Sequence, residues 1–558
     1  MIRRSSRLFF LLFLTAACRS EEPALPLSLL PPDAERSTHA ELVDFFHAWR
    51  NFQAPVMTEG IPDYSLQAMS LQRRTLPAWQ TALAAVDTSG WSVEEQIDWY
   101  LVWAEMNGLD FAHRVTRPWA RDPAFYTWFY PSPTDVPERE GPNIHGAIEL
   151  PRYTWPLSGQ DAATIAVRLR RMEEVLSAGR RNLTGSGKDL WTLAVRSMRE
   201  QSADLESFAQ SVEADYPDLA SAAREARLAS EAFADWITEQ LPTKTGPSGL
   251  GKDHYSWNLR NVHLLPYSWE EQVVIMRREL ARAHAALRLE EHRNRALPRL
   301  SRIDTREEYD RRLHAAVTEY IAFLKEEEIV PVKGYMDAAL RAQVGRFAPA
   351  EGLRGFFSEI TYRDPIVMRT HHYHWIDLAR MRDEAHQSPV RRTPLLYNIF
   401  DGRAEGMATG MEEMMMHAGL LDDRPRAREL VWILLAQRAA RGLGGLYQHG
   451  LEMTFEEATQ YASKWTPWGL LPAEGSTIQH EEQFYLQQPA YGTSYVIGKI
   501  EIEHLIAEYA RQREGQFVLS EFMEEFNRAG VIPVSLIYWE LTGDKSMLER
   551  AIGGSEGS

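Results

Sequence analysis

The sequence predicts an all-α protein, and three observations support this fold class. Apolar residues recur at three- and four-residue spacing through much of the 558-residue chain, which is the spacing of a buried helix face. The alternating pattern of half-buried strands is scarce. No stretch between residues 38 and 555 is rich enough in linker residues to divide the chain, so we expect a single large multi-helical domain.

The expected helices follow one another from residue 39 onward. In segment 269–293, for example, Val273, Met276, Leu280 and Ala283 form one apolar stripe. Residues 118–156 are aromatic and rich in proline, and we expect them to form an ordered loop. Because 44% of the residues are apolar, the chain can bury a large core. The longest expected helices cover residues 40–49, 162–183, 189–213, 219–240, 269–293 and 307–328.

The first twenty residues predict export and attachment of a lipid. Three arginines precede a short apolar run at residues 8–14, and small residues then lead to Cys18. This order is typical of a secretory signal peptide, and the run is far shorter than the roughly 20 residues of a membrane-spanning helix. The segment LTAAC resembles the bacterial lipobox, although Leu14 stands four residues before the cysteine instead of three. An ordinary signal peptide with an incidental cysteine is the alternative.

These features divide the chain into three parts. We expect a signal peptide at residues 1–17, the lipidated Cys18 and a flexible tether at residues 18–37, and the helical domain at residues 38–558. Cys18 is the only cysteine, so the exported domain has no disulfide bond and depends on its core for stability. Because Arg19 rather than aspartate follows the cysteine, the resemblance to sorted lipoproteins points to the outer membrane in a Gram-negative host.

The charge of the chain argues against two classes of partner. The formal net charge is -17, and removal of the signal arginines makes the mature chain more acidic. An acidic surface argues against binding of nucleic acid and against docking on anionic lipid. We therefore expect contact with the membrane through the N-terminal lipid only.

A group of histidine and glutamate residues is the strongest candidate for a polar site. His371 and His374 lie three residues apart and so share a helix face, whereas His372 points elsewhere. About thirty residues later, Glu405 shares a helix face with Glu412 in a segment rich in methionine. A carboxylate among apolar side chains needs a partner, and histidine nitrogens with a glutamate oxygen suit zinc. The alternative is a buried hydrogen-bonded network that only holds helices together.

Longer motifs around this group resemble the DUF885 family. Segment 405–408, EGMA, is similar to the family's EGWALY motif. Segment 488–499, QPAYGTSYVIGK, resembles PGQATSYxxGK, and segment 251–255, GKDHY, resembles GxExY. The family contains large, helical, often exported bacterial proteins of metallopeptidase type. The resemblance covers nearly all of residues 38–545. It implies one domain with a deep central cleft, as in peptidases similar to angiotensin-converting enzyme or thermostable carboxypeptidase.

The family's metal motif, HExxPGHH, is degenerate in this chain. When its last two histidines are aligned with His371 and His372, Pro365 and Ile366 stand where the first histidine and the glutamate belong. A zinc hydrolase needs three protein ligands and a group that takes the proton of water, and these two residues supply neither. The resemblance retains the equivalents of His371, His372 and Glu405 as metal ligands.

Two functions remain open. In the first, the protein is a pseudoenzyme whose cleft binds a peptide or small-molecule ligand without hydrolysis. In the second, it is an active metal-dependent hydrolase or peptidase with a rebuilt zinc site, in which His374 joins His371 and Glu405. The catalytic candidates for this second function are Glu412, Glu481 or His449 as the base and Tyr495 as the oxyanion donor.

Overall fold

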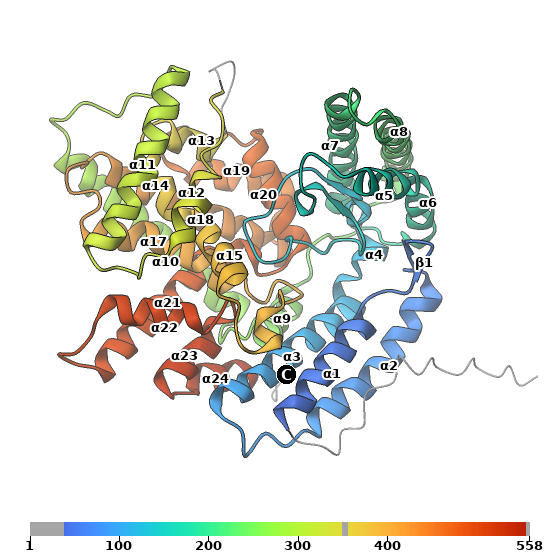
Figure 1. Ribbon diagram of the computed structural model, residues 1–558, viewed down its shortest axis with the longest axis horizontal. Helices are drawn as coiled ribbons and strands as arrows, with labels where there is room; N and C mark the ends of the chain where they lie inside the picture. Colours follow the sequence, from blue (N-terminus) through green and yellow to red (C-terminus); the bar gives the residue numbers. More distant parts are fainter. Residues whose placement is uncertain (1–37, 349–354, 554–558) are drawn as a thin grey trace, which may run out of the picture.

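The all-α prediction is confirmed by the computed structural model, which describes residues 38–348 and 355–553. The structure is 69% helical, and the strands of the described residues form only two small sheets. Strand β1 (Met57–Thr58) pairs antiparallel with β2 (Ile61–Pro62), and β3 (Phe129–Tyr130) pairs parallel with β4 (Ile148–Glu149). The architecture therefore depends on the packing of helices against helices (Figure 1).

Three helices, α1 (His39–Gln53), α2 (Leu66–Ala84) and α3 (Val93–Phe111), begin the described chain. Helices α1 and α3 each start with a capping box, in which Thr38 or Ser92 and a glutamate three residues later satisfy free backbone amides. The three helices pack against one another and lie beside each other in Figure 1.

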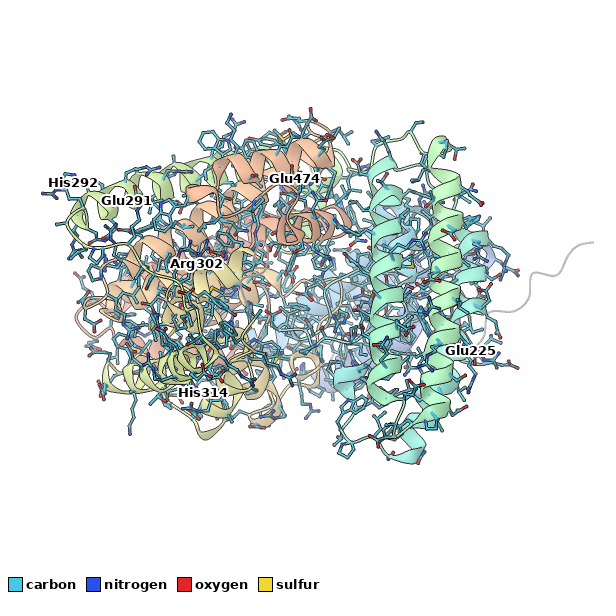
Figure 2. The ribbon with its side chains drawn as sticks, turned by 90° about the horizontal axis from the view of Figure 1, so that it is seen from above. Glu225, Glu291, His292, Arg302, His314 and Glu474 are labelled. Carbon is cyan, nitrogen blue, oxygen red and sulfur yellow. The ribbon has the colours of Figure 1, made fainter. Side chains whose placement is uncertain are left out.

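A small lobe follows, with a hydrophobic core of its own. Its two long helices, α7 and α8, pack side by side at one end of the molecule, and Figure 2 shows the exposed Glu225 on α8. The single helix expected over 162–183 is wrong, because the chain breaks into α5 and α6 at Arg171. Leu169 before the break and Met172 after it are both fully buried. The helices of this lobe are α5 (Gly159–Arg170), α6 (Met172–Asn182), α7 (Lys188–Val212) and α8 (Pro217–Gln240).

The proline-rich segment 118–156 is ordered, as predicted, and it holds short elements rather than loop alone. It contains α4 (Pro118–Arg121), η3 (Pro123–Tyr126), β3, β4 and η4 (Leu150–Arg152). Its rings Phe125, Tyr126 and Trp128 are buried in the core of the small lobe.

The large lobe shares a second, larger core with α1–α3. Helix α18 is its central element, because all of its residues from 429 to 449 are buried and it packs against α10, α19, α20 and α21. The helices of the lobe are α9 (Lys252–Asn261), α10 (Trp269–Arg293), α11 (Arg306–Glu326), α12 (Gly334–Arg341), α13 (Phe356–Thr361), α14 (Pro365–His371), α15 (Tyr373–Asp383), α16 (Pro389–Arg392), α17 (Asp401–Ala418), α18 (Ala427–His449), α19 (Phe455–Trp465), α20 (Ser476–Gln487), α21 (Tyr491–Gln512), α22 (Leu519–Arg528), α23 (Val534–Thr542) and α24 (Ser546–Gly553).

The N-terminal predictions are not tested by this structure. The signal peptide, Cys18 and the tether lie outside the described residues. Within the two described ranges, none of the helices combines the length and the apolar character that crossing a bilayer requires.

Candidate metal centre

The candidate site begins at a break between α14 and α15. Helix α14 starts with Pro365 at its first position, where the missing amide hydrogen costs no hydrogen bond, and it ends at His371. His372 separates it from α15. Across this break the rings of His371 and His374 stand 5.2 Å apart and nearly perpendicular, at 88°. Both rings therefore face the same region of the large lobe.

Helix α17 supplies the carboxylate, and glycines fix its position. A Cβ atom at Gly406 would lie 2.4 Å from the carbonyl carbon of Gly498 on α21, and one at Gly498 would lie 1.9 Å from the oxygen of Gly402. Only glycine permits this close approach of two helix backbones. The approach places Glu405 beside the N-terminal turns of α21, which carry Tyr491.

Three side chains converge where these elements meet. One ligand atom from each of His371, His374 and Glu405 lies within 4.8 Å of the others. The Nε2 atom of His374 and the Oε2 atom of Glu405 are 3.1 Å apart, and both side chains are 2% exposed. Within the described part of the chain, neither atom has a hydrogen-bond partner of good geometry. The structure thus brings His371, His374 and Glu405 together, whereas His372 is not part of this group.

Burial and charge act in opposite directions on this group. Burial alone would lower the pKa of His374, but the charge of Glu405 raises it to about 9. Burial would raise the pKa of Glu405, but His374 lowers it to about 2. Burial, followed by the charge of Arg438, lowers the pKa of His371 well below its usual value. Without a metal, His374 and Glu405 thus form a buried ion pair beside a neutral imidazole.

Glu412 and Arg438 lie behind His371. The guanidinium of Arg438 donates two hydrogen bonds to the oxygens of Glu412, at 2.8 and 2.7 Å. The Nδ1 atom of His371 lies 3.1 Å from Glu412 Oε1 and 3.1 Å from Arg438 Nη2. Because a guanidinium only donates, Arg438 Nη2 can donate to Nδ1 only when the ring proton is on Nε2. Metal binding through Nε2 requires the other tautomer, in which Nδ1 carries the proton and donates to Glu412 Oε1. This position favours an orienting role for Glu412 over the role of base that we expected.

Two tyrosines and two further acids surround the cluster. Tyr495 donates to the hydroxyl oxygen of Tyr491 at 3.0 Å. Tyr491 in turn lies 3.1 Å from Glu405 Oε1 and 3.2 Å from Glu140 Oε1. Burial and the charge of Asp135 raise the pKa of Glu140 to about 7. A protonated Glu140 can therefore donate to Tyr491 while Tyr491 donates to Glu405.

Two other predicted catalytic residues have partners of their own. His449, at the end of α18, donates from Nε2 to the carbonyl oxygen of Tyr485 at 2.7 Å, and its ring lies 5.2 Å from that of Tyr255. These contacts favour a structural role. Glu481 lies 2.7 Å from Arg441 and accepts a hydrogen bond from the Tyr485 hydroxyl at 2.7 Å. Its carboxylate is therefore engaged rather than free.

Several site residues were missed by the sequence reasoning. Asp135 and Glu140 come from the proline-rich segment, which has no periodicity that indicates where its side chains point. Asp401 begins α17 one turn before Glu405, and within the described residues both of its oxygens lack partners. Arg438 and Arg441 could have been found from the sequence. They interrupt the otherwise apolar pattern of α18, and arginines in such a pattern indicate buried charges that need partners.

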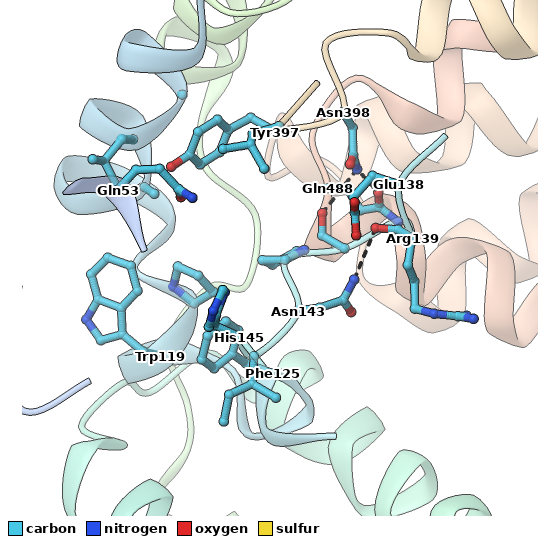
Figure 3. Close-up of a pocket in the computed structure, with 18 of the residues that line it drawn as sticks. Gln53, Trp119, Phe125, Glu138, Arg139, Asn143, His145, Tyr397, Asn398 and Gln488 are labelled. Carbon is cyan, nitrogen blue, oxygen red and sulfur yellow. Dashed lines mark hydrogen bonds between the residues drawn. The ribbon is translucent and has the colours of Figure 1, made fainter. Parts of the chain in front are cut away.

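A cavity of about 660 Å³ lies between the two lobes. Figure 3 shows Trp119, Phe125 and His145 on one side of it, with Asn398 and Gln488 across from them. The three converging residues do not line it. The two sites share a wall, because residues 138, 139 and 141 line the cavity while the side chain of Glu140 reaches Tyr491.

Two solved structures are similar to the whole fold. One is a proposed lipoprotein of unknown function from Shewanella oneidensis, with a TM-score of 0.66, 14% identity, and coverage of 90% of this chain and 100% of that chain. The other is a proposed lipoprotein from Colwellia psychrerythraea, with a TM-score of 0.66, 14% identity, and coverage of 93% and 100%. No protein-family model and no curated protein matches the sequence, so membership of DUF885 stays a prediction. At this identity the likeness establishes that this chain shares the fold of the two structures.

Proposed function

We propose that this chain is a lipid-anchored envelope protein with a metal-dependent hydrolase site at His371, His374 and Glu405. One observation carries the proposal: the three side chains converge, and His374 Nε2 and Glu405 Oε2, 3.1 Å apart, make no hydrogen bond of good geometry among the described residues. Buried polar atoms without well-formed hydrogen bonds are costly, and a divalent cation would satisfy all three ligands together. Two imidazole nitrogens and one carboxylate oxygen form a ligand set typical of catalytic zinc.

The surrounding residues supply the other groups that hydrolysis needs. A zinc ion in this site would act as a Lewis acid and make water a better nucleophile. Tyr491 donates to Glu405, and Tyr495 donates to Tyr491. Tyr495 is therefore the candidate donor to an oxygen that gains negative charge, by exchanging its hydrogen bond to Tyr491 for one to that oxygen. Asp135 brings a further carboxyl group close enough to interact electrostatically with His374 and Glu405, so it is a candidate acceptor for the proton of water, whereas Glu140 acts as the donor to Tyr491.

The anchored state is supported from two directions. The N-terminal sequence has the basic, apolar and small-residue regions of an export signal that ends at Cys18. The two similar structures are both described as proposed lipoproteins. We place the mature chain in the cell envelope, at the outer membrane in a Gram-negative host, with the lipid as its only attachment.

Binding of a peptide or small ligand without hydrolysis is the second candidate function. It is favoured by the pairing of His374 with Glu405, because opposite charges 3.1 Å apart stabilise each other without a metal. Ile366 stands at the position of the family's catalytic glutamate, and its side chain is fully buried. In this case the 660 Å³ cavity is the binding site.

The two candidates are separated by the metal content of the purified full-length chain, measured by mass spectrometry. We expect about one zinc ion per chain in the wild type, and much less in His374→Gln and Glu405→Gln. His113→Gln removes an equally buried imidazole from the N-terminal helices and should retain the metal. A wild type without metal, or variants that retain it, would overturn the metal-dependent proposal.

A further inference from the structure

Arg441 is a buried cation that, among the described residues, has a charged partner in Glu481 but unsatisfied N–H donors. Its side chain is 0% exposed, on the central helix α18. In the described ranges, none of its three guanidinium nitrogens makes a hydrogen bond of good geometry. Its closest charged neighbour is Glu481, with an N–O distance of 2.7 Å. A guanidinium has five N–H donors, so most of its hydrogen-bonding capacity is unused.

The contrast with Arg438, one helical turn earlier, is informative. Arg438 is equally buried, but it donates to both oxygens of Glu412 and lies beside His371. Within the described ranges, Arg441 faces Glu481 without such a two-pronged set of hydrogen bonds. The charge of Arg441 is therefore balanced, but most of its N–H donors are unsatisfied, which is costly unless another molecule supplies acceptors.

Aromatic rings hold Arg441 in place at the edge of the candidate metal centre. Its guanidinium carbon lies 4.5 Å from the centre of the Tyr495 ring, 5.6 Å from Phe357 and 5.7 Å from Tyr485. Tyr495 is linked through the hydroxyl of Tyr491 to Glu405. A group bound to Arg441 would thus lie next to the three converging ligands.

We propose that Arg441 binds a free carboxylate group of the substrate, such as the C-terminus of a peptide, and thereby fixes the substrate beside His371, His374 and Glu405. The inference deepens the proposed function and rests on it, because it names the end of the molecule that the same site recognises. A planar guanidinium matches a carboxylate with two parallel hydrogen bonds. The ring stacking orients the guanidinium before binding, so little conformational freedom is lost.

A carboxylate fits this position better than a phosphate does. The same region holds Glu405, Glu412 and Glu481, and their negative charges repel a dianion more strongly than a monoanion. The incoming carboxylate takes the place of Glu481 on Arg441. Glu481 is 17% exposed and keeps its hydrogen bond from the Tyr485 hydroxyl, so it can move aside without losing every partner.

The test compares the affinities of matched peptides for the full mature chain. The probes are N-acetylated tripeptides that vary in the last residue, each made as the free acid and as the C-terminal amide, with binding measured by calorimetry. We expect the free acids to bind at least about tenfold more tightly than the amides. The affinities are measured both on the protein as purified and after removal of metal by a chelator. The comparison of acid with amide can therefore be interpreted even if the protein proves to bind no metal.

Variants then assign the preference to Arg441. Arg441→Gln should remove the difference between acid and amide, and Arg441→Lys should reduce it, because lysine keeps the charge but lacks the fork. Arg391→Lys is the matched control: Arg391 is also fully buried, but Asp98, Glu540 and backbone oxygens occupy its donors. Equal affinity of wild type for acid and amide overturns the inference without any variant. An acid preference that survives in Arg441→Gln, or tighter binding of inorganic phosphate than of acetate, also overturns it.

Discussion

Replacing Glu405 by glutamine should abolish stabilisation by zinc. The amide oxygen of glutamine is a weak zinc ligand, and the substitution keeps the size of a side chain that is 2% exposed. A metal that binds only the folded state adds RT ln(1 + [L]/Kd), about 2.7 kcal/mol at a hundredfold excess over Kd. With an unfolding entropy of about 2.1 cal/mol/K per residue over roughly 500 residues, this free energy raises the Tm by about 2–3 °C.

The assay is a calorimetric melting scan of the chelated protein with and without added zinc. We expect the rise of about 2–3 °C in the wild type and no rise in Glu405→Gln. If the cluster is only a structural ion pair, zinc will not shift the wild type, and Glu405→Gln will lose about 1.5–3 kcal/mol with or without zinc. An equal zinc-induced shift in both proteins would refute the reasoning, because the metal would then bind elsewhere.

Three further predictions follow from the chain. Cys18→Ser should leave an uncut precursor or an unlipidated product in the soluble fraction, and wild type that takes up no fatty-acid label would exclude the anchor. Glu501 is fully buried without a hydrogen-bond partner among the described residues, and burial raises its pKa to about 8. The folded state then binds this proton more tightly than the unfolded state. The resulting stability is complete below pH 4.5, the ordinary pKa, and on the order of 4 kcal/mol is lost by pH 8. Glu501→Gln should remove that loss in denaturant titrations at pH 5 and pH 8, whereas an unchanged pH dependence would contradict the assignment. Gly406→Ala should destabilise the protein by about 1–3 kcal/mol or more and weaken zinc binding, because the added Cβ forces α17 away from Gly498. An unchanged Tm of this variant would show that the two helices tolerate separation.

The parts of the fold that depend on local periodicity could be predicted from the sequence. Helices α7, α8, α10 and α11 begin and end within two residues of the expected ranges. Their apolar stripes repeat without interruption, so the helical period is readable from the chain itself. The break at Arg171 could not be read in this way. The buried apolar positions keep helical spacing across it, from Leu169 to Met172, so the local pattern does not mark the break.

The residues of the candidate site also fall into those that local spacing indicates and those that only tertiary contacts bring together. His371 and His374 share a face because they are three residues apart, and Glu405 was conspicuous as a carboxylate on an apolar helix. The positions of Glu140 and Arg441 depend on contacts between residues far apart in the sequence. Glu140 meets Tyr491 across 351 positions, and such a contact leaves no local pattern.

X-ray absorption at the zinc edge identifies the atoms that surround the metal, and so distinguishes a site built from two imidazoles and one carboxylate from any other. The proposed site should give a spectrum of nitrogen and oxygen neighbours only, at about 2.0–2.2 Å, with the multiple-scattering pattern of two histidines. Glu405→Gln, which should hold much less zinc, should give a correspondingly weak signal at the zinc edge. A zinc ion with sulfur neighbours, one surrounded by oxygen alone, or a wild type that holds no zinc would contradict the account.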